Sequence, residues 1–351
     1  MPHDDPSPTE TEAAADAPET ASAENGAAFP VVGVGASAGG LEALTQLLKA
    51  LPRDTGMAFV IVQHLAPDHA SSLAEILSRT TKMKVCEVRD EPTVEPDHVY
   101  VIPPGRDMII AGGKLRLLAQ VREARHRGID QFFRSLAEDS AHQAIGVVLS
   151  GSASDGTLGL EVIKAEGGVT FAQDESAQHD SMPKSAVASG CVDFVLPPEG
   201  IAREIARIAR HPYIAAVAEE GGGGDGPGHG RIAEIVRRAT GVDFTHYKAA
   251  TMQRRIERRM MVHKVATLAE YEERLRAMPG EIEALYQDVL INVTSFFRNP
   301  EAFEVLEKKI FPKLLAGRPA SDPVRMWTLG CSTGEEAYSL AMLFAECAEA
   351  A

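Results

Sequence analysis

The amino-acid sequence predicts an α/β fold with a mostly parallel, doubly wound sheet, followed by a small all-α domain and one further strand–helix unit. Three observations lead to this expectation. Short β-branched runs alternate with helical patterns between residues 29 and 212, as in parallel sheets covered by helices on both faces. A glycine-rich stretch then interrupts the alternation. Only helical patterns follow until residue 324, where one more strand begins.

The elements of the first domain can be assigned in chain order. Leucines at positions 41, 44, 47 and 48 share one face and predict a helix that ends before Pro52. Three short runs punctuated by Pro and Gly, at 99–102, 108–111 and 115–118, predict an inserted antiparallel meander. Further strands are predicted at 31–35, 58–62, 85–88, 144–149, 169–172 and 192–196, and further helices at 69–79, 129–140, 157–166 and 199–210.

The remaining segments differ in composition. Residues 1–28 hold seven carboxylates and no Lys or Arg, so we expect a disordered acidic tail. Residues 213–230 are rich in glycine and predict a flexible linker. Residues 231–318 predict a helical domain. Residues 319–351 offer one strand at 324–329 and one helix, too little for a core of their own, and therefore predict an incomplete domain.

Length and charge limit the class of protein. The chain has 351 residues, which at about 150 residues per domain predicts two domains or slightly more. A net charge of −15 argues against a protein that coats nucleic acid or an anionic membrane. No run approaches the roughly 18 apolar residues of a membrane span, and the N-terminal residues do not resemble a secretory signal. The sequence therefore predicts a cytoplasmic protein without membrane insertion.

The cysteines show no metal-binding pattern. There is no C-x-x-C pair and no neighbouring histidine at ligand spacing. We therefore expect neither a disulfide nor a metal site at Cys86, Cys191, Cys331 or Cys347.

Three predicted strands run into polar residues of one hydrolytic triad. Ser37 follows the first strand, His64 follows the second, and Asp155 follows the strand at 144–149. In open α/β sheets, reactive groups gather beyond the carboxyl ends of the strands. A serine becomes a nucleophile near neutral pH when a histidine, oriented by a carboxylate, accepts its proton. The three residues therefore predict acyl transfer, with Ser37 as nucleophile, His64 as general base and Asp155 as orienting acid.

Each signal also has an alternative interpretation. Gly33-x-Gly35-x-x-x-Gly39 resembles a nicotinamide-dinucleotide turn, although no acidic residue ends the second strand to bind a ribose. Asp155 before Gly156 is also typical of a helix cap. His64 could be a hydrogen-bonded core residue. A nicotinamide-dependent oxidoreductase is therefore the weaker alternative to a hydrolase.

Six motifs of the first domain resemble the chemotaxis protein-glutamate methylesterase family, CheB, in the same order. They are Gly35-Ala36-Ser37-Ala38-Gly39-Gly40, Val62-Gln63-His64, residues 99–105, residues 129–133, residues 149–156 and Met182-Pro183. The resemblance covers about residues 29–212 and places the family's catalytic residues on Ser37, His64 and Asp155. It implies hydrolysis of γ-glutamyl methyl esters on receptor signalling helices, deamidation of certain glutamines, and no cofactor for the esterase. The family's usual Thr-Gly-Met-Gly is Ser150-Gly151-Ser152-Ala153 here.

A second constellation begins with a basic helix at 247–260. Arg254 and Arg258, like Arg255 and Arg259, are four residues apart and share a helix face. A solvated face is the usual interpretation of such a pattern. The alternative is docking onto acidic protein helices, since no interleaved aromatic residues support nucleic-acid binding.

Together with residues 294–298 and 332–339, this helix resembles the chemotaxis receptor methyltransferase family, CheR. The resemblance implies S-adenosylmethionine as cofactor, with Arg298, Thr333 and Glu335 on the cofactor side. It also implies receptor docking through Arg254, Arg255, Arg258 and Arg259. It covers only the helical domain and the opening of the catalytic domain, so we expect no methyl transfer from this chain, and a bifunctional protein if the parent is longer. A non-catalytic scaffold that binds receptors or kinases is the alternative to the esterase.

Overall fold

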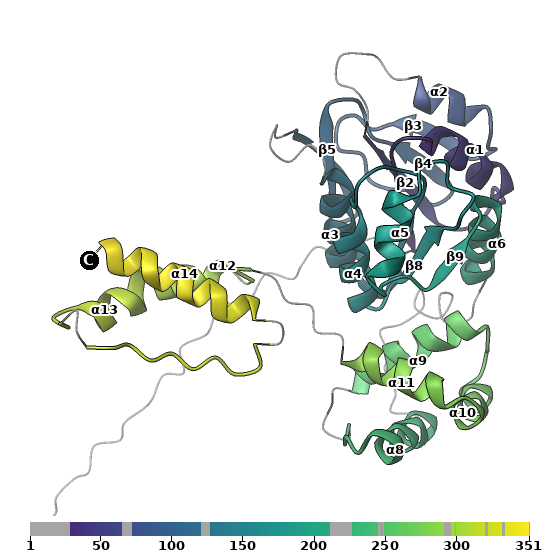
Figure 1. Cartoon of the computed structure of the whole chain (residues 1–351). Coiled ribbons are helices and arrows are strands. Elements are labelled where there is room, and N and C mark those ends of the chain that lie inside the picture. Colours follow the sequence, from purple (N-terminus) through teal and green to yellow (C-terminus); the bar gives the residue numbers. More distant parts are fainter. Residues whose placement is uncertain are drawn as a thin grey trace, which may run out of the picture.

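The structure is a computed structural model that describes residues 29–64, 72–120, 127–210, 227–244, 247, 249–290, 296–298, 300–319, 322–331 and 334–350. Its first domain contains a seven-stranded sheet in the order β3-β4-β2-β1-β7-β8-β9 (Figure 1). Every strand pairing in this sheet is parallel. The strands are β1 (Val31–Ala36), β2 (Ala58–Gln63), β3 (Lys84–Glu87), β4 (His98–Val101), β7 (Ala144–Val148), β8 (Val169–Gln173) and β9 (Phe194–Leu196).

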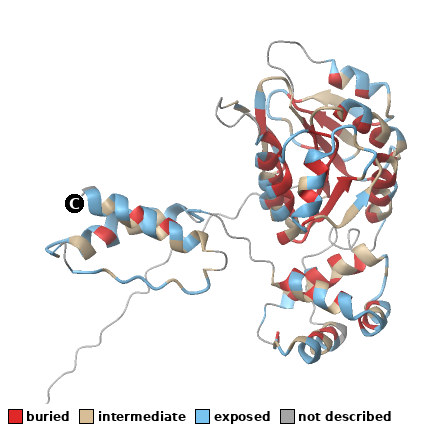
Figure 2. Ribbon diagram, viewed as in Figure 1, coloured by how far each residue is buried: buried red, intermediate tan, exposed pale blue. Residues whose placement is uncertain are grey.

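Helices cover both faces of this sheet, which confirms the predicted doubly wound fold (Figures 1 and 2). Successive residues of β2 alternate between the two faces, because strand side chains point to opposite sides in turn: Phe59 and Ile61 join one apolar cluster, Val60 and Val62 the other. The first cluster includes residues of α1 (Gly40–Ala50), α2 (Leu73–Ser78) and α6 (Pro198–Ala209). The second includes residues of α3 (Gly128–Ser140), α4 (Thr157–Ala165) and α5 (Ser181–Ala188).

Glycines in β1 bring α3 close to the sheet. A Cβ atom on Gly35 would lie 2.4 Å from Ile129 Cγ2, and one on Gly33 would lie 2.9 Å from a ring carbon of Phe133. Such distances are shorter than ordinary packing contacts, so a larger residue would push the helix away. The glycines thereby place the first turn of α3 beside the carboxyl end of β1.

The predicted antiparallel meander is wrong for its first strand. β4 lies inside the main sheet, parallel to β2 and β3, whereas only β5 (Arg106–Ala111) and β6 (Lys114–Ala119) form an antiparallel hairpin. Val99, Tyr100 and Val101 are all buried, as expected for a strand covered on both faces. The predicted helix at 69–79 begins at Leu73 among the described residues, and residues 65–71 lie outside them.

The described residues of the second domain form helices and no strand, as predicted. They are α8 (Pro227–Thr240), α9 (Ala249–His263), α10 (Leu268–Ala277) and α11 (Pro279–Val289). Ile232, Ile256, Tyr271 and Leu285 are fully buried in its apolar core. A capping box in which Thr267 and Glu270 exchange hydrogen bonds begins α10.

The C-terminal part contains α12 (Pro300–Val305), a π-helix (Leu306–Ile310), α13 (Phe311–Leu315) and α14 (Glu335–Ala350). The strand predicted at 324–329 is not formed. A strand needs a partner for its backbone groups, and no described strand lies in this part of the chain.

The acidic tail and most of the predicted linker lie outside the described residues. The domain boundaries predicted from the sequence stay predictions. None of the described helices is long and apolar enough to cross a lipid bilayer.

Candidate active site

Ser37 and His64 meet at the carboxyl end of the sheet. Ser37 directly follows β1 and His64 directly follows β2, and the register pairs Ala36 with Gln63, the last residues of these two strands. Both Ser37 and His64 line a cleft of about 720 Å³ at the start of α1. The parallel register is therefore what places the predicted nucleophile and base on one cleft.

His64 is hydrogen-bonded to Asp155. The distance from His64 Nε2 to Asp155 Oδ2 is 2.8 Å, and Asp155 is only 3% exposed. The carboxylate also accepts backbone N–H donors from Ile129 at 3.0 Å, from Asp130 at 2.9 Å and from Gly156 at 2.9 Å. Two of these donors belong to the first turn of α3, where unpaired N–H groups and the helix dipole favour a negative charge. This environment fixes the carboxylate, which in turn fixes the imidazole.

The turn that carries Ser37 is held by backbone and side-chain contacts. Gly40 N–H donates to Ser37 O at 2.9 Å, and Gly39 adopts a left-handed φ of 72°. The buried hydroxyl of Ser150 donates to Ala38 O at 2.9 Å. Ser37 N–H in turn donates to Ser150 O at 3.0 Å. The loop after β7 thus braces the turn after β1.

Two glutamines of the cleft were not predicted from the sequence. Gln63 lines it, and its buried Oε1 has no hydrogen-bond partner among the described residues. Gln178 lies across the turn, with its Oε1 2.8 Å from the position of a Cβ on Gly39. The position of Gln63 at the end of a strand, beside His64, is a signal that could have identified it. Gln178 comes from the segment after β8 and carries no such signal.

Two further carboxyl groups lie near the pair. Asp130 Oδ1 accepts from Gly159 N–H at 2.8 Å, and burial raises the pKa of Asp130 to about 6. Burial and the nearby charge of Asp155 also raise the pKa of Asp107, while His64 opposes this. The site therefore places two further carboxyl groups, those of Asp107 and Asp130, close to the carboxylate of Asp155.

The geometry disfavours a dinucleotide site at this turn. Gly33 and Gly35 face side chains of α3, so close packing explains the absence of side chains there. The residues that end and follow β2 are Gln63 and His64, neither of which is the acidic residue that binds a ribose.

The predicted cofactor-side residues are brought together only in part. Phe297 N–H donates to Ser339 Oγ at 2.9 Å, which places the exposed Arg298 segment beside the first turns of α14, where Glu335 begins the helix. Thr333 lies outside the described residues. A nucleoside binds in the crevice at the carboxyl ends of parallel strands, and the described residues of this part contain no strand. These residues alone do not form a complete cofactor site.

The interpretation of the basic face of α9 as a solvated surface is wrong. Arg258 is fully buried and Arg255 is 9% exposed, because both contact the first domain. Arg259 forms an ion pair with Glu281 of α11. Only Arg254 is exposed among the four. An external partner therefore cannot reach Arg255 or Arg258 in this arrangement.

The fold and the cleft are those of an α/β domain with a candidate hydrolytic site, joined to a helical domain. Family models agree with this division of the chain. A model described as CheB methylesterase matches residues 32–205. Those described as CheR methyltransferase, all-alpha domain, and CheR methyltransferase, SAM binding domain, match residues 230–290 and 292–351. Residues 32–205 therefore form a CheB methylesterase domain, and CheR methyltransferase domains follow it in the same chain. The CheR family implies S-adenosylmethionine for this second part.

Individual relatives cover parts of this arrangement. A Rhodobacter capsulatus protein, called an uncharacterized 104.1 kDa protein in the hypE 3′ region, is 41% identical over 80% of this chain and 32% of its own length. A protein-glutamate methylesterase/protein-glutamine glutaminase of Burkholderia lata is 40% identical over 51% of this chain and 54% of its own length. The Thermotoga maritima CheB methylesterase catalytic domain is 31% identical, with a TM-score of 0.48 over 51% of this chain and 98% of that domain. The chain thus spans about a third of the length of the Rhodobacter protein and about half of that of the Burkholderia protein.

Proposed function

We propose that the first domain is a protein-glutamate methylesterase that hydrolyses γ-glutamyl methyl esters on cytoplasmic signalling helices of receptors. The observation that carries this proposal is the 2.8 Å pair of His64 with the buried Asp155, on a cleft that Ser37 also lines. The Burkholderia lata relative, a protein-glutamate methylesterase/protein-glutamine glutaminase, supports the same substrate class.

The proposed mechanism assigns one chemical role to each of these three residues. Ser37 Oγ attacks the ester carbonyl while His64 takes its proton, and Asp155 stabilises the imidazolium. Backbone N–H groups at the start of α1, which lines the cleft, stabilise the oxyanion. His64 then returns the proton to the leaving methanol. Water, activated by His64, hydrolyses the acyl-enzyme and restores Ser37 with a free glutamate as product.

The same steps accommodate a glutamine side chain. With an amide in place of the ester, His64 donates its proton to the amide nitrogen, which leaves as ammonia when the C–N bond breaks, and hydrolysis of the same acyl-enzyme again yields glutamate. A cleft that binds the glutamyl ester also accepts the carboxamide, because the two groups differ little in size. Deamidation is therefore part of the proposed activity.

Methanol release from a methyl-esterified receptor fragment tests the proposal. We expect the Ser37→Ala variant to lose activity at least about a thousandfold, since it removes the nucleophile. Ser152→Ala is the matched control, because Ser152 is an exposed serine in a neighbouring loop. Circular dichroism checks that all three proteins are folded.

The outcomes separate the enzyme from its alternative. Methanol release that persists in Ser37→Ala would contradict the assigned nucleophile. If the parent chain and both variants are folded and none releases methanol, the non-catalytic scaffold that binds receptors or kinases becomes the better interpretation.

A further inference from the structure

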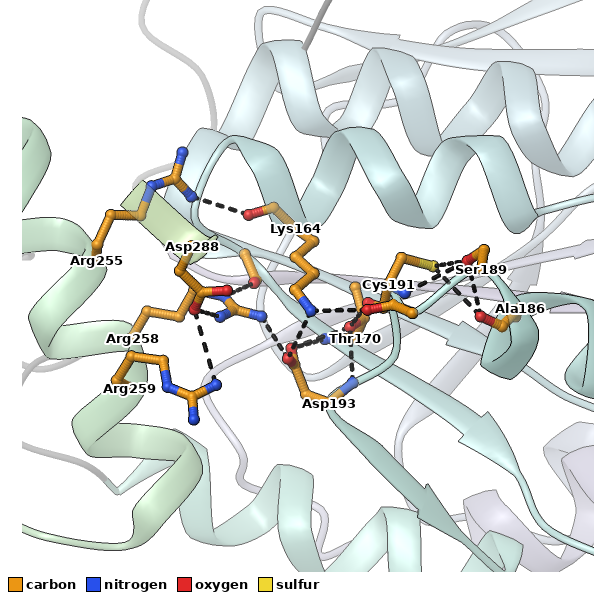
Figure 3. Close-up of polar contacts among 12 residues, drawn as sticks. Lys164, Thr170, Ala186, Ser189, Cys191, Asp193, Arg255, Arg258, Arg259 and Asp288 are labelled. Atoms are coloured by element: carbon orange, nitrogen blue, oxygen red, sulfur yellow. Dashed lines mark hydrogen bonds and ion pairs between the residues drawn. The ribbon is translucent and has the colours of Figure 1, made fainter. Parts of the chain in front are cut away.

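Arg258 of α9 bridges carboxylates of two domains. Its side chain is fully buried and forms ion pairs with Asp193 of the esterase domain and with Asp288 of α11 (Figure 3). Its Nε also donates to Gly168 O at 2.9 Å. Neither domain alone supplies all of these partners. A buried guanidinium requires such full pairing because the cost of removing it from water is high.

Arg255 makes a second contact, one turn earlier on the same helix. Its guanidinium donates to Lys164 O at 2.9 Å and also to Ala165 O. These are carbonyl groups of the last two residues of α4, where unpaired acceptors and the negative end of the helix dipole attract a cation. Figure 3 shows Arg255 and Arg258 reaching from the helical domain to the esterase.

The interface also has an apolar part. Met261 of α9 is fully buried in the apolar cluster that contains Ile205 and Ile208 of α6. Arg207 of α6 donates to Met261 O at 2.7 Å, and Lys264 is paired with Glu204 at 3.1 Å. Apolar burial accompanied by charged pairs is typical of a specific interface, because the polar groups fix the orientation.

The contact lies away from the catalytic cleft. Gly168 directly precedes β8 and Asp193 directly precedes β9, so both sit at the amino ends of strands. Ser37 and His64 follow the carboxyl ends of β1 and β2. Because the strands are parallel, these are opposite ends of one sheet.

From these contacts, we infer that the arginine face of α9 is an internal docking face whose partner is the esterase domain of the same chain. It holds the helical domain at the sheet end opposite the cleft, so that the two domains move as one body. An acidic partner reaches Arg255 and Arg258 only when the domains separate.

Hydrogen exchange on the whole chain tests this inference. Arg255→Met is the cleanest variant, because it removes bonds to esterase backbone carbonyls and leaves no carboxylate of the helical domain unpaired. We expect amide exchange at residues 166–168 to accelerate about tenfold or more, since two hydrogen bonds to the end of α4 are lost. Arg254→Met is the matched control on the same helix, and we expect it to exchange like the parent.

Small-angle scattering supplies an independent measurement. Arg255→Met and Arg258→Met are expected to increase the radius of gyration, whereas Arg254→Met leaves it unchanged. Unchanged exchange and scattering in Arg255→Met would overturn the inference, as would an equal effect of Arg254→Met. If Arg258→Met fails to fold, Arg255→Met still decides. Neither measurement uses substrate, so the result is independent of whether the esterase proposal holds.

Discussion

Asp130 connects the predicted catalytic aspartate to two helices. Its backbone N–H donates to Asp155, and its carboxylate accepts from Gly159 in the first turns of α4. Burial raises its pKa from 3.8 to about 6, and the charge of Asp155 adds to this effect. Asp130 has no assigned role in the reaction, yet its pKa lies close to the pH range in which a histidine acts as a general base.

The raised pKa of Asp130 predicts a pH dependence of stability. The folded chain binds this proton more tightly than the unfolded chain, so the stabilisation is complete below about pH 4 and is lost as pH rises through about 6. The difference between 3.8 and about 6 corresponds to about 3 kcal/mol. Asp130→Asn keeps an acceptor for Gly159 and does not titrate. Urea unfolding between pH 4 and 7 should therefore show a flatter pH dependence in the variant than in the parent.

Titrating groups that do not interact with Asp130 act equally in both proteins, so the difference between the two curves reports on Asp130 and its charged neighbour Asp155. Glu175→Gln, a change at an exposed carboxylate, should follow the parent curve. Parallel curves for the parent and Asp130→Asn would contradict the assignment of this titration.

Single residues differ in how far the sequence places them. Ser37 and His64 each follow a strand of clear pattern, so their meeting follows from the sheet alone. The partners of Arg258 lie 30 and 65 residues away, at Asp288 and Asp193. The composition of the helix predicted that Arg258 is exposed to solvent, because no local sequence pattern indicates that two distant carboxylates pair with it in the folded chain. Residues fixed by strand order were predictable, and those fixed by docking were not.

At the level of elements, the β1–α1 turn combines a special backbone conformation with close packing. Gly39 has a φ of 72°, and a Cβ there would lie 2.7 Å from Ser150 Oγ. Gly56 has nearly the same φ, 71°, but a Cβ there would meet nothing within 4 Å. Substituting alanine at Gly56 therefore tests the free-energy cost of the left-handed backbone alone, whereas alanine at Gly39 adds the cost of a steric contact.

Alanine substitutions at the two positions should differ. We expect Gly56→Ala to lower the free energy of unfolding by about 1 kcal/mol, the cost of a left-handed alanine partly offset by reduced entropy of the unfolded chain. Gly39→Ala should cost more and also reduce methanol release, because Ser150 must move and Ser37 moves with it. Denaturant unfolding and methanol release measure the two effects. Equal loss of stability, with full activity in Gly39→Ala, would show that the contact with Ser150 does not position the turn.

Segments with a strand pattern form strands where a partner strand exists. The run at 99–102 was recognised as extended, but its place beside β2 and β3 depends on which strands are available to pair. The run at 324–329 has a similar apolar pattern and forms no strand, since no described strand lies beside it. Pattern thus identifies a segment that can extend, and tertiary pairing decides whether it does.

At the scale of the whole molecule, the C-terminal part has helices that pack on one another but leave apolar residues in water. The rings of Phe311 and Phe344 lie 5.4 Å apart, between α13 and α14. Trp327, the only tryptophan of the chain, is 86% exposed, and Tyr338 is 65% exposed. The esterase and helical domains, by contrast, each enclose a core. The chain therefore combines two packed domains with a C-terminal part whose described residues form no sheet for a nucleoside.

This contrast predicts that the present chain does not bind S-adenosylmethionine tightly and transfers no methyl group. Arg298 and Glu335 lie on neighbouring segments, but a nucleoside site needs the ends of parallel strands, and none is described there. Because Trp327 is the single tryptophan, its fluorescence reports on this part alone. Titration with S-adenosylmethionine should leave the emission that of a water-exposed indole, calorimetry should show no heat of tight binding, and methanol release should be unaffected. A saturable change in emission that disappears in Trp327→Phe, together with matching heat, would mean that α12 to α14 already hold the cofactor without a sheet.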